Sequence, residues 1–443
     1  MEKLIELFFN AASMERWNDH IRPVSLVELD KQAHKIIIAY MIAKIEEDEG
    51  KHDINWINII NKFLFDFFYR IVLTDLKPPV FHELMKKKKN ELNQYVLGKI
   101  KPLLDDFSLD YGKMFESHVN CEKNTIEDRI INAAHYLATD WEFKIIYNAG
   151  PFIYGIDKTK ENIEKQIEYH YDLKGVSKLK LSKDLYGFMD LCGQLRFQKR
   201  WAHTPRVPET SVLGHMLVVA TTSYLFALQS LENPCEKRLY NDFFGGLFHD
   251  LPEVLTKDII SPVKRSVKGL EDIIKDLEES QMDKHIYNLL PNEWVEELKY
   301  LTVDEFENKI TIKTEISNKT NNKIKNKVTN KVTNKVKKEN NEKIGHKSGK
   351  YIENEMKKEI KIVSFEDYNK YNLNKYNPLD GKLIDVADKL AAFAEAKLSI
   401  RHGLTSKALE NAVKSIKEEN LNKNIPNLNI KQIYENLEKI IED

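Results

Sequence analysis

An adjacent histidine and aspartate, His249 and Asp250, stand in an apolar run of the sequence between Phe243 and Leu255. An imidazole and a carboxylate side by side can both bind one divalent cation. Packing alone has no use for two such groups among phenylalanines and leucines, because burying them without partners costs free energy. Glu253 follows His249 by four residues, which would place both on one side of a helix. The pair is therefore the candidate centre of a metal-dependent hydrolase.

Two further segments could complete a metal site. His215 lies in an apolar segment that is expected to begin a helix after Thr210 or Ser211, since either residue can cap a helix. Asp385 and Asp388 lie three residues apart on a third apolar segment, and both could approach a metal, one of them as a second-shell group. Two imidazoles and two carboxylates suit Mn²⁺, Fe²⁺, Co²⁺, Zn²⁺ or Ni²⁺. Helical proteins hold such sites by projecting the ligands inward from facing helices.

Helical periodicity dominates the chain, so we predict an all-α fold. Glycine is scarce, at 16 of 443 residues, and no long alternating strand patterns joined by hairpin turns occur. Apolar residues recur at intervals of three and four in residues 33–44, 57–73, 130–147, 212–231, 240–256, 382–400 and 430–441.

Composition excludes several classes of protein. The formal net charge is −1, from 68 basic and 69 acidic residues, so no global field favours nucleic acid or an anionic membrane as a partner. Three widely spaced cysteines fit a reducing compartment and exclude a disulfide framework. The first ten residues lack the basic region and cleavage site of a signal peptide, and the apolar run at residues 63–73 is too short to span a bilayer. We therefore expect a soluble, cytoplasmic protein.

One segment differs in composition from the rest. Residues 311–340 contain 9 lysines and 7 asparagines, and no aromatic residue falls between Phe306 and Tyr351. Such a segment buries too little apolar area to offset its ordering entropy, so we predict that residues 308–350 form a disordered or extended surface insertion. A basic arm for nucleic acid is the weaker interpretation, because glutamate and asparagine dilute the charge and no aromatic side chain offers stacking.

Landmarks of the second half recur in order in the first half. Arg-Trp pairs stand at residues 16–17 and 200–201, and Pro-Val pairs stand at residues 79–80 and 262–263, with His34 and His215 between them. Further along, residues 134–138 resemble residues 387–391, with His135 at the position that Asp388 has in the second run. We therefore predict that residues 1–170 are a duplicated copy whose metal site has decayed and which now packs or forms an interface, and that residues 185–443 are the catalytic domain. Counting back from each Pro-Val pair gives three correspondences: Asp66 with His249, Phe67 with Asp250, and Arg70 with Glu253.

The ordered set of histidines and aspartates resembles the HD-domain superfamily of metal-dependent phosphohydrolases. The closer likeness is to the bacterial branch that includes the 5′-deoxynucleotidases. It covers roughly residues 185–300 and 375–405. The residues that carry it are Arg200-Trp201, Pro208-Glu209, His215, the run from Leu247 to Glu253, Asp258, Pro262-Val263-Lys264 and the run from Val386 to Leu390.

The resemblance implies a role for each matching residue. Arg200 would contact phosphate, which a guanidinium can bind with two hydrogen bonds, and Glu253 would be the acid/base residue near a metal-bound water. His203 and Arg206 could add phosphate or sugar contacts, although an ordinary exposed loop is an equal alternative. The ligands of one divalent cation (Mn, Co, Fe, Zn, Ni or Mg) would be His215, His249, Asp250 and Asp388.

Two departures from that branch bear on substrate selection. The spacing from Glu209 to His215 is one residue longer, and the glutamate that commonly stands beside the histidine is replaced by Gly214. Asp258 is expected to be structural, and Lys264 and Arg265 to be a solvated basic pair.

We expect hydrolysis of a nucleotide-like phosphate ester, of the 5′-nucleotidase type, by a metal-activated water. One alternative is a larger nucleotide, such as a triphosphate or an alarmone. Another is a regulatory or scaffold protein with a structural metal, which the presence of Glu253 and Arg200 argues against. No P-loop, nucleophile elbow, dinucleotide fingerprint or HExxH motif occurs. The expected partner is a small phosphorylated substrate, with neither a membrane nor nucleic acid, and a homodimer is compatible with these features.

Overall fold

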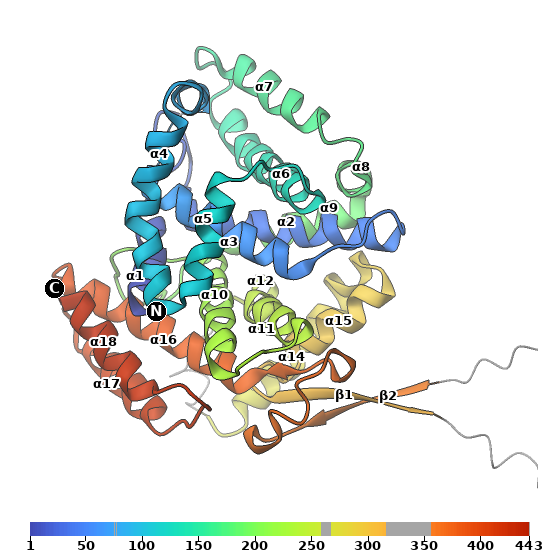
Figure 1. Ribbon diagram of the computed structural model, residues 1–443, viewed down its shortest axis with the longest axis vertical. Coiled ribbons are helices and arrows are strands. Elements are labelled where there is room, and N and C mark those ends of the chain that lie inside the picture. Colours follow the sequence, from blue (N-terminus) through green and yellow to red (C-terminus); the bar gives the residue numbers. More distant parts are fainter. Residues whose placement is uncertain (75, 77, 258–266, 316–355, 443) are drawn as a thin grey trace, which may run out of the picture.

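The computed structural model describes residues 1–74, 76, 78–257, 267–315 and 356–442. Helices dominate this part of the chain (Figure 1), and the predicted all-α fold class is confirmed. Most of the Lys/Asn-rich segment lies outside the described residues. So do Asp258, Pro262-Val263, Lys264 and Arg265.

The elements follow one another in two groups. The first half of the chain contains α1 (Glu2–Ala12), α2 (Glu28–Asp48), α3 (Trp56–Leu73), α4 (Pro78–Phe107), α5 (Leu109–Asn120), α6 (Ile126–Ala149) and α7 (Ile156–Glu168). Two short helices, α8 (Lys174–Leu181) and α9 (Lys183–Gln194), lead to the second half. The second half contains α10 (Val212–Ser230), α11 (Glu236–Phe248), α12 (Glu253–Thr256), α14 (Leu270–His285), α15 (Asn292–Thr302), β1 (Asn308–Glu315), β2 (Met356–Ile362), β3 (Leu379–Asp380), α16 (Gly381–Arg401), α17 (Lys407–Leu421) and α18 (Ile430–Glu442).

Side-chain caps set the start of two helices that matter for the site. Ser211, one of the two predicted caps, precedes α10, and its Oγ accepts a hydrogen bond of 2.9 Å from the Gly214 amide. Thr125 and Asp128 form a reciprocal capping box at the start of α6. Such caps satisfy amide groups that have no partner inside the helix. The sequence thereby fixes where the helix that carries His215 begins.

A small sheet corrects one prediction. Residues 308–315 do not belong to a disordered insertion, because they form β1, which pairs antiparallel with β2 and β3 in the order β2-β1-β3. Ile310 in this strand is buried, and the Lys309 ammonium donates to the carbonyls of Tyr300 and Val303 at 2.6 Å each. The strand was missed because its partner β2 lies beyond the Lys/Asn-rich segment, so no local hairpin pattern announces it.

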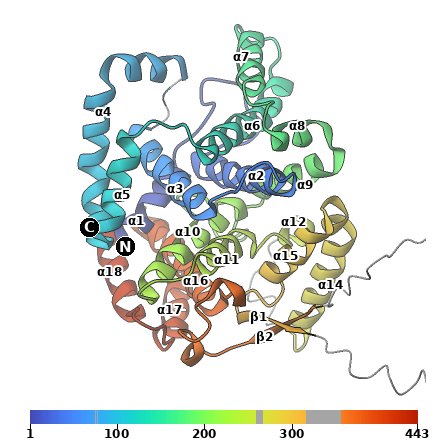
Figure 2. The same ribbon diagram turned by 45° about the vertical axis from the view of Figure 1, so that its right-hand side comes forward.

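The two halves share one hydrophobic core. Figures 1 and 2 show α2, α3 and α6 stacked on α10, α11 and α16. Across this contact the Tyr40 ring lies 5.0 Å from the Phe244 ring and 5.3 Å from the Phe248 ring, measured between centroids. Helices α8 and α9, which lie at the predicted boundary between residues 170 and 185, also pack against α2. The division into two domains stays a prediction, and the halves pack as closely as parts of one domain.

Close packing of α2 on α10 accounts for Gly214. A Cβ atom at this position would lie 2.7 Å from Oδ1 of Asp30 and 3.0 Å from a methyl carbon of Leu29. The same Asp30 oxygen accepts a hydrogen bond of 2.6 Å from the Ser211 hydroxyl, which caps α10. The first half therefore occupies the space that a glutamate beside His215 would need.

Asp30 yields a pH-dependent prediction. Burial raises its pKa to about 6, although Arg196 and Ser211 oppose the shift. In the unfolded chain Asp30 ionises near its ordinary pKa of 3.8. The ionised carboxylate of Asp30 therefore destabilises the folded state. This loss of stability grows as pH rises from about 4 to about 6 and reaches its full size above about pH 6. We expect Asp30→Asn to raise the free energy of unfolding at pH 7.5 by about 2 kcal/mol, and the gain to shrink below pH 6. Urea unfolding at pH 5 and 7.5 checks this, and an unchanged or growing gain at pH 5 would contradict it.

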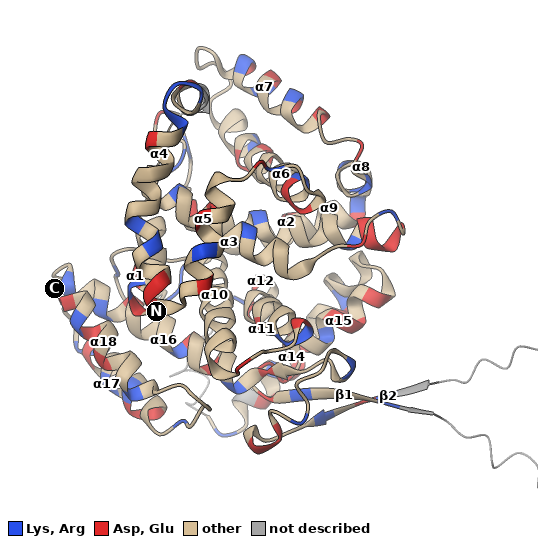
Figure 3. Ribbon diagram, viewed as in Figure 1, with Lys and Arg blue, Asp and Glu red and all other residues tan. Residues whose placement is uncertain are grey.

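Helix α10 is long and unusually apolar. By length and composition it could cross a membrane, but 89% of its most apolar window is buried inside the fold. That burial is typical of the core helix of a soluble protein. Figure 3 shows basic and acidic residues interspersed along the outer helices, in keeping with a formal net charge of −1.

Candidate metal centre

The predicted ligands come together from three elements. His215 projects from α10, Asp388 from α16, and the His249-Asp250 pair lies in the turn after α11. His215 Nε2 lies 2.9 Å from Asp388 Oδ1 and 3.9 Å from Asp250 Oδ2, and His249 Nε2 lies 3.2 Å from Asp250 Oδ2. Ligand atoms of His215, His249 and Asp388 all fall within 4.8 Å of one another. One cation could contact all of them, with Asp250 at the edge of the group.

A break in the helix places Asp250 beside His249, and it corrects the prediction of one helix through residues 240–256. Helix α11 ends at Phe248, residues 249–252 form a turn, and α12 begins at Glu253. Pro252 has no amide hydrogen, and its ring would clash with the carbonyl four residues earlier, so the helix stops there. Neighbouring residues on a continuous helix point about 100° apart. The turn removes that constraint, and Glu253 therefore does not share one helix face with His249.

The orientation of His249 suits a metal ligand. Its Nδ1 lies 2.8 Å from the Gly246 carbonyl, and since a carbonyl only accepts, Nδ1 carries the hydrogen. The lone pair of the neutral ring then sits on Nε2, a buried atom with no hydrogen-bond partner of good geometry among the described residues. Gly246 also lets the two histidine helices approach, because a Cβ there would lie 2.8 Å from Ala220 Cα. A hydrogen bond from the other ring nitrogen to a carbonyl is what orients a metal-ligating histidine.

Charge interactions keep the carboxylates ionised. Burial opposes ionisation of Asp250, but His249 and Arg200 outweigh it and lower its pKa to about 2. The pKa of Asp388 is likewise lowered despite burial, mainly by His215 and then by Arg200. Burial disfavours the imidazolium of His249, yet the Asp250 carboxylate raises its pKa to about 9. A proton on His249 thus balances the negative charge of the carboxylates, which is the role that a bound cation would have. The set of imidazoles and carboxylates therefore fits a divalent metal.

Arg200 reaches the same group. Its Nη1 lies 3.4 Å from Asp250 Oδ2, its Nη2 lies 3.9 Å from Asp388 Oδ1, and its side chain is 13% exposed. The guanidinium therefore lies beside both candidate carboxylate ligands, partly open to solvent. An arginine there can bind phosphate oxygens next to the metal.

Glu395, which the sequence analysis missed, supports this arrangement. It lies on α16 seven residues after Asp388, is 1% exposed, and accepts hydrogen bonds from Trp201 Nε1 at 2.8 Å and Thr210 Oγ1 at 2.6 Å. Its carboxylate also lies 3.4 Å from Arg200 Nε and 3.7 Å from His215 Nδ1. Burial opposes its ionisation, but Arg206 and Arg200 hold its pKa well below the usual range. The available signal was an acid two turns from Asp388 on the same face of an apolar helix.

Two predicted substrate contacts have different surroundings. Arg206 is buried, with Nη2 2.6 Å from Thr210 Oγ1 and Nη1 3.5 Å from Glu395 Oε2. The guanidinium is engaged in holding Glu395 in place, and a direct substrate contact of Arg206 stays a prediction. His203 is exposed in the loop before α10, so it remains available to a substrate.

The two remaining candidates, Asp385 and Glu253, have different surroundings. Asp385 pairs with Lys389 at 2.7 Å and with Lys423, which follows α17, so its carboxylate is engaged away from the histidines. This supports Asp388 as the ligand from α16.

Glu253 is buried at the start of α12, and its carbonyl accepts a hydrogen bond of 2.9 Å from Gln198, two residues before Arg200. The segments that carry Glu253 and Arg200 are thereby tied together.

The first half contains a parallel set of contacts. Trp17 and Trp201 both adopt positive φ, at 55° and 60°. Trp17 Nε1 and Arg16 Nε each donate to Glu142 Oε2 at 2.9 Å, as Trp201 and Arg200 approach Glu395. Matching backbone bridges accompany these contacts, joining Glu15 to Val27 and Lys199 to Ser211.

The ligand positions of this parallel set hold different residues. Lys31 follows Arg16 by 15 residues, as His215 follows Arg200, and its Nζ lies 2.5 Å from Nδ1 of His135. His34, the histidine noted from sequence, lies elsewhere: its Nε2 faces the Met189 carbonyl at 3.0 Å, and its ring packs on Trp141. A buried lysine, whose pKa burial lowers well below its usual value, therefore stands where the second half has the candidate ligand His215.

Comparison with known proteins adds one finding. A family model described as an HD domain matches residues 192–417 of this chain. No curated protein and no solved structure gives a significant match.

Proposed function

This chain belongs to the HD-domain family, within a superfamily of metal-dependent phosphohydrolases, and we propose that its second half hydrolyses a nucleotide-like phosphate ester of the 5′-nucleotidase type. The observation that carries the proposal is the convergence of His215, His249, Asp250 and Asp388 with Arg200 beside both carboxylates. A purely structural metal needs no partly exposed arginine next to its ligands. The regulatory or scaffold alternative therefore has less support.

The chemistry divides among a few groups. A divalent cation held by the two histidines and two aspartates would polarise phosphate and supply hydroxide at neutral pH. Arg200 would bind the phosphoryl oxygens and offset the charge that develops as the bond to phosphorus forms. The leaving oxygen of the ester departs with the bonding electron pair and needs a proton, which Glu253 would supply.

Glu395 acts through its neighbours rather than on the substrate. It is buried and holds the side chains of Arg200 and Trp201 together with the Nδ1 edge of His215. Groups that fix a ligand and a phosphate contact in one orientation contribute to catalysis by positioning. We assign Arg206 to the same supporting set.

An aromatic group beside the metal centre favours a nucleotide among phosphate esters. The Phe306 ring lies 6.2 Å from the His249 ring, between centroids, in the short segment between α15 and β1. Lys389 approaches the same ring, with Nζ 5.7 Å from its centroid. A ring at the rim of a phosphate site can stack on a base.

We further propose that the first half is a duplicated copy without the hydrolytic site. The support is the shared Arg-Trp-Glu arrangement, with Arg16, Trp17 and Glu142 matching Arg200, Trp201 and Glu395. Helix α3 also continues unbroken through Asp66 and Phe67, where α11 ends and the turn begins. Without that turn and with lysine in place of histidine, no equivalent ligand set forms among the described residues.

Glu253→Gln tests the acid/base assignment. Phosphate release from nucleoside monophosphates should fall about 10²–10⁴-fold, because the leaving oxygen loses its proton donor. The metal content should stay at the wild-type value. Glu209→Gln, at an exposed glutamate paired with Lys199, is the matched control and should change neither. Full activity in Glu253→Gln would remove this residue from the mechanism.

A screen of monophosphates, triphosphates and alarmones over several divalent metals tests the proposed function itself. Absence of phosphate release from all of them would reject it.

A further inference from the structure

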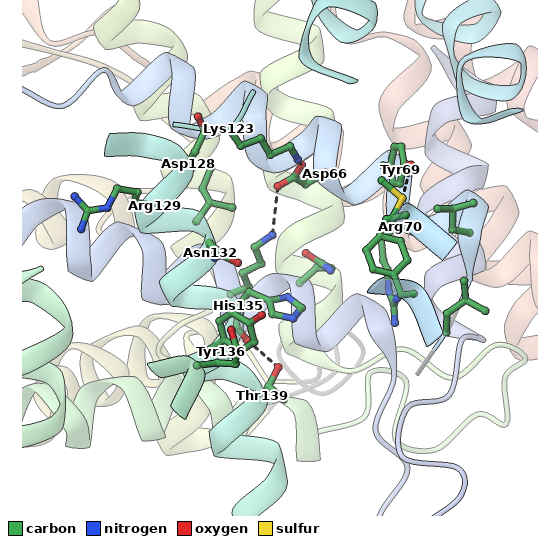
Figure 4. Close-up of a pocket in the computed structure, with 18 of the residues that line it drawn as sticks. Asp66, Tyr69, Arg70, Lys123, Asp128, Arg129, Asn132, His135, Tyr136 and Thr139 are labelled. Atoms are coloured by element: carbon green, nitrogen blue, oxygen red, sulfur yellow. Dashed lines mark hydrogen bonds and ion pairs between the residues drawn. The ribbon is translucent and has the colours of Figure 1, made fainter. Parts of the chain in front are cut away.

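The first half contains a cavity of about 1260 Å³ that the hydrolytic site does not use. All of its lining residues lie between Arg16 and His170, so it belongs entirely to this half. Figure 4 shows Asp66, Tyr69 and Arg70 of α3 on one side and Asn132, His135 and Tyr136 of α6 on the other. This volume lies above the range of roughly 300–1,000 Å³ that is typical of small-molecule pockets, so it is large enough for such a ligand.

Cationic side chains outnumber acidic ones around this cavity. Counting histidine as neutral, six basic and four acidic residues give the lining a formal charge of +2. The basic residues are Arg16, Lys35, Arg70, Lys89, Lys123 and Arg129, and the acidic ones are Asp19, Asp66, Glu122 and Asp128.

The arginines of the lining are paired with carboxylates outside it, whereas Lys35 and Lys123 pair with Asp66 inside it. Arg16 pairs with Glu28 and Glu142, and Arg70 lies 3.5 Å from Glu28, but neither glutamate lines the cavity. Arg129 pairs with Asp172, which also lies outside the lining. The carboxylates thus sit behind the arginines, which positions the guanidinium groups as an anion site does.

Two buried polar groups in the lining point to a polar occupant. His170 Nε2 lies 3.3 Å from the Asn132 amide nitrogen, which donates to it, so Nδ1 carries the ring hydrogen. That Nδ1 has no hydrogen-bond partner among the described residues, and neither does Oε1 of Gln32. Both side chains are more than nine-tenths buried. Buried polar atoms without partners are rare in folded proteins, and a polar molecule that reached these two atoms would satisfy them.

Aromatic rings complete the chemistry. Trp17, Tyr69, Phe81 and Tyr136 all line the cavity. Rings beside a cluster of arginines and lysines suit a planar base that is joined to a phosphate. A metal-bridged ligand is excluded at this place by its residues, because Lys31 contacts His135 where a ligand pair would stand.

We propose that the cavity of the first half binds a nucleoside phosphate directly, without a metal and without hydrolysing it. The phosphate lies among Arg16, Lys35 and Arg70, and the base lies against the aromatic rings. Duplication has then yielded one copy that turns over a phosphorylated substrate and one that only holds such a molecule. The first half would therefore provide a second binding site but no second reaction.

The test uses the full-length chain with Asp250→Ala, in EDTA, so that the metal-dependent site is silent. AMP, GMP, ATP and GTP are titrated by calorimetry, with adenosine, guanosine and inorganic phosphate as probes of each part of the ligand. We expect one nucleoside phosphate to bind with a stoichiometry of one, and the nucleosides and phosphate alone to bind at least about tenfold more weakly.

Substitutions in the lining then locate the site. Arg70→Gln and Lys35→Gln should each weaken binding about tenfold or more, because a phosphate loses a charged contact. Lys358→Gln, at an exposed lysine of β2 in the second half, should leave binding unchanged. Circular dichroism of each variant confirms folding. Absence of binding by all four nucleotides would overturn the proposal, as would unchanged affinity in both lining variants. Because the assay measures binding without metal, its outcome is independent of whether the second half hydrolyses nucleotides.

Discussion

Replacing Asp250 with alanine is expected to strip the metal from the second half and to abolish turnover. The carboxylate lies 3.2 Å from His249 Nε2 and 3.9 Å from His215 Nε2, at the edge of the group formed by His215, His249 and Asp388. Loss of a residue that only orients a ligand typically weakens metal binding 10–100-fold, so loss of a ligand should cost about 100-fold or more. Phosphate release should fall about 10³-fold, since the cation supplies several kcal/mol of charge stabilisation.

The matched control for this substitution is Asp385→Ala. Asp385 is an acid on the same helix as Asp388, but its carboxylate pairs with Lys389 and Lys423. That variant should retain about one metal ion per chain and most of the activity. Metal analysis of both purified variants, joined to a phosphate-release assay, distinguishes a ligand from a neighbouring acid. A metal-loaded, active Asp250→Ala protein would contradict the ligand assignment.

Glu395→Gln should have the largest effect on stability. Its carboxylate is fully buried against the guanidinium groups of Arg200 and Arg206. Removing one partner from a buried ionic group leaves the other charge uncompensated, which costs about 3–5 kcal/mol. The free energy of unfolding from urea titration measures this loss. Turnover should also fall, because Arg200 and His215 lose the group that orients them.

Two further variants show whether Glu395 acts through burial and through the site. Glu438→Gln, on α18, removes a carboxylate from a more exposed group of lysines and should cost no more than about 1 kcal/mol. Glu142→Gln removes the matching buried carboxylate of the first half, which holds Arg16 and Arg196. It should destabilise the protein about as much as Glu395→Gln and yet leave the metal bound. Equal stability of Glu395→Gln and the wild type would contradict this account.

The sequence identified the candidate ligands better than their setting. The pair His249-Asp250 drew notice because an imidazole and a carboxylate are costly among apolar residues unless they have partners, and the family resemblance added His215 and Asp388. Their convergence required packing of α10, α11 and α16 that no local pattern encodes. The break after Phe248 was readable from Pro252, but helical periodicity across residues 240–256 outweighed it.

Residues that act through other residues were harder to identify. Glu395 resembles an ordinary helical glutamate in sequence, and only its burial against two arginines reveals its role. Arg206 was considered either a substrate contact or part of an ordinary exposed loop, whereas the fold buries its side chain against Glu395. Lys31 was overlooked in favour of His34, since residue type was weighed above spacing. The strand β1 escaped because its partner follows the Lys/Asn-rich segment.

The central claim is that only the second of two related halves keeps a metal site, and metal content per chain tests it most directly. The purified wild-type protein should hold about one transition-metal ion per chain. His215→Ala should reduce that value to near zero, whereas His135→Ala, at the place of the first half that corresponds to Asp388, should leave it at one. Two ions per chain, or loss of metal on substitution of His135 but not of His215, would contradict it.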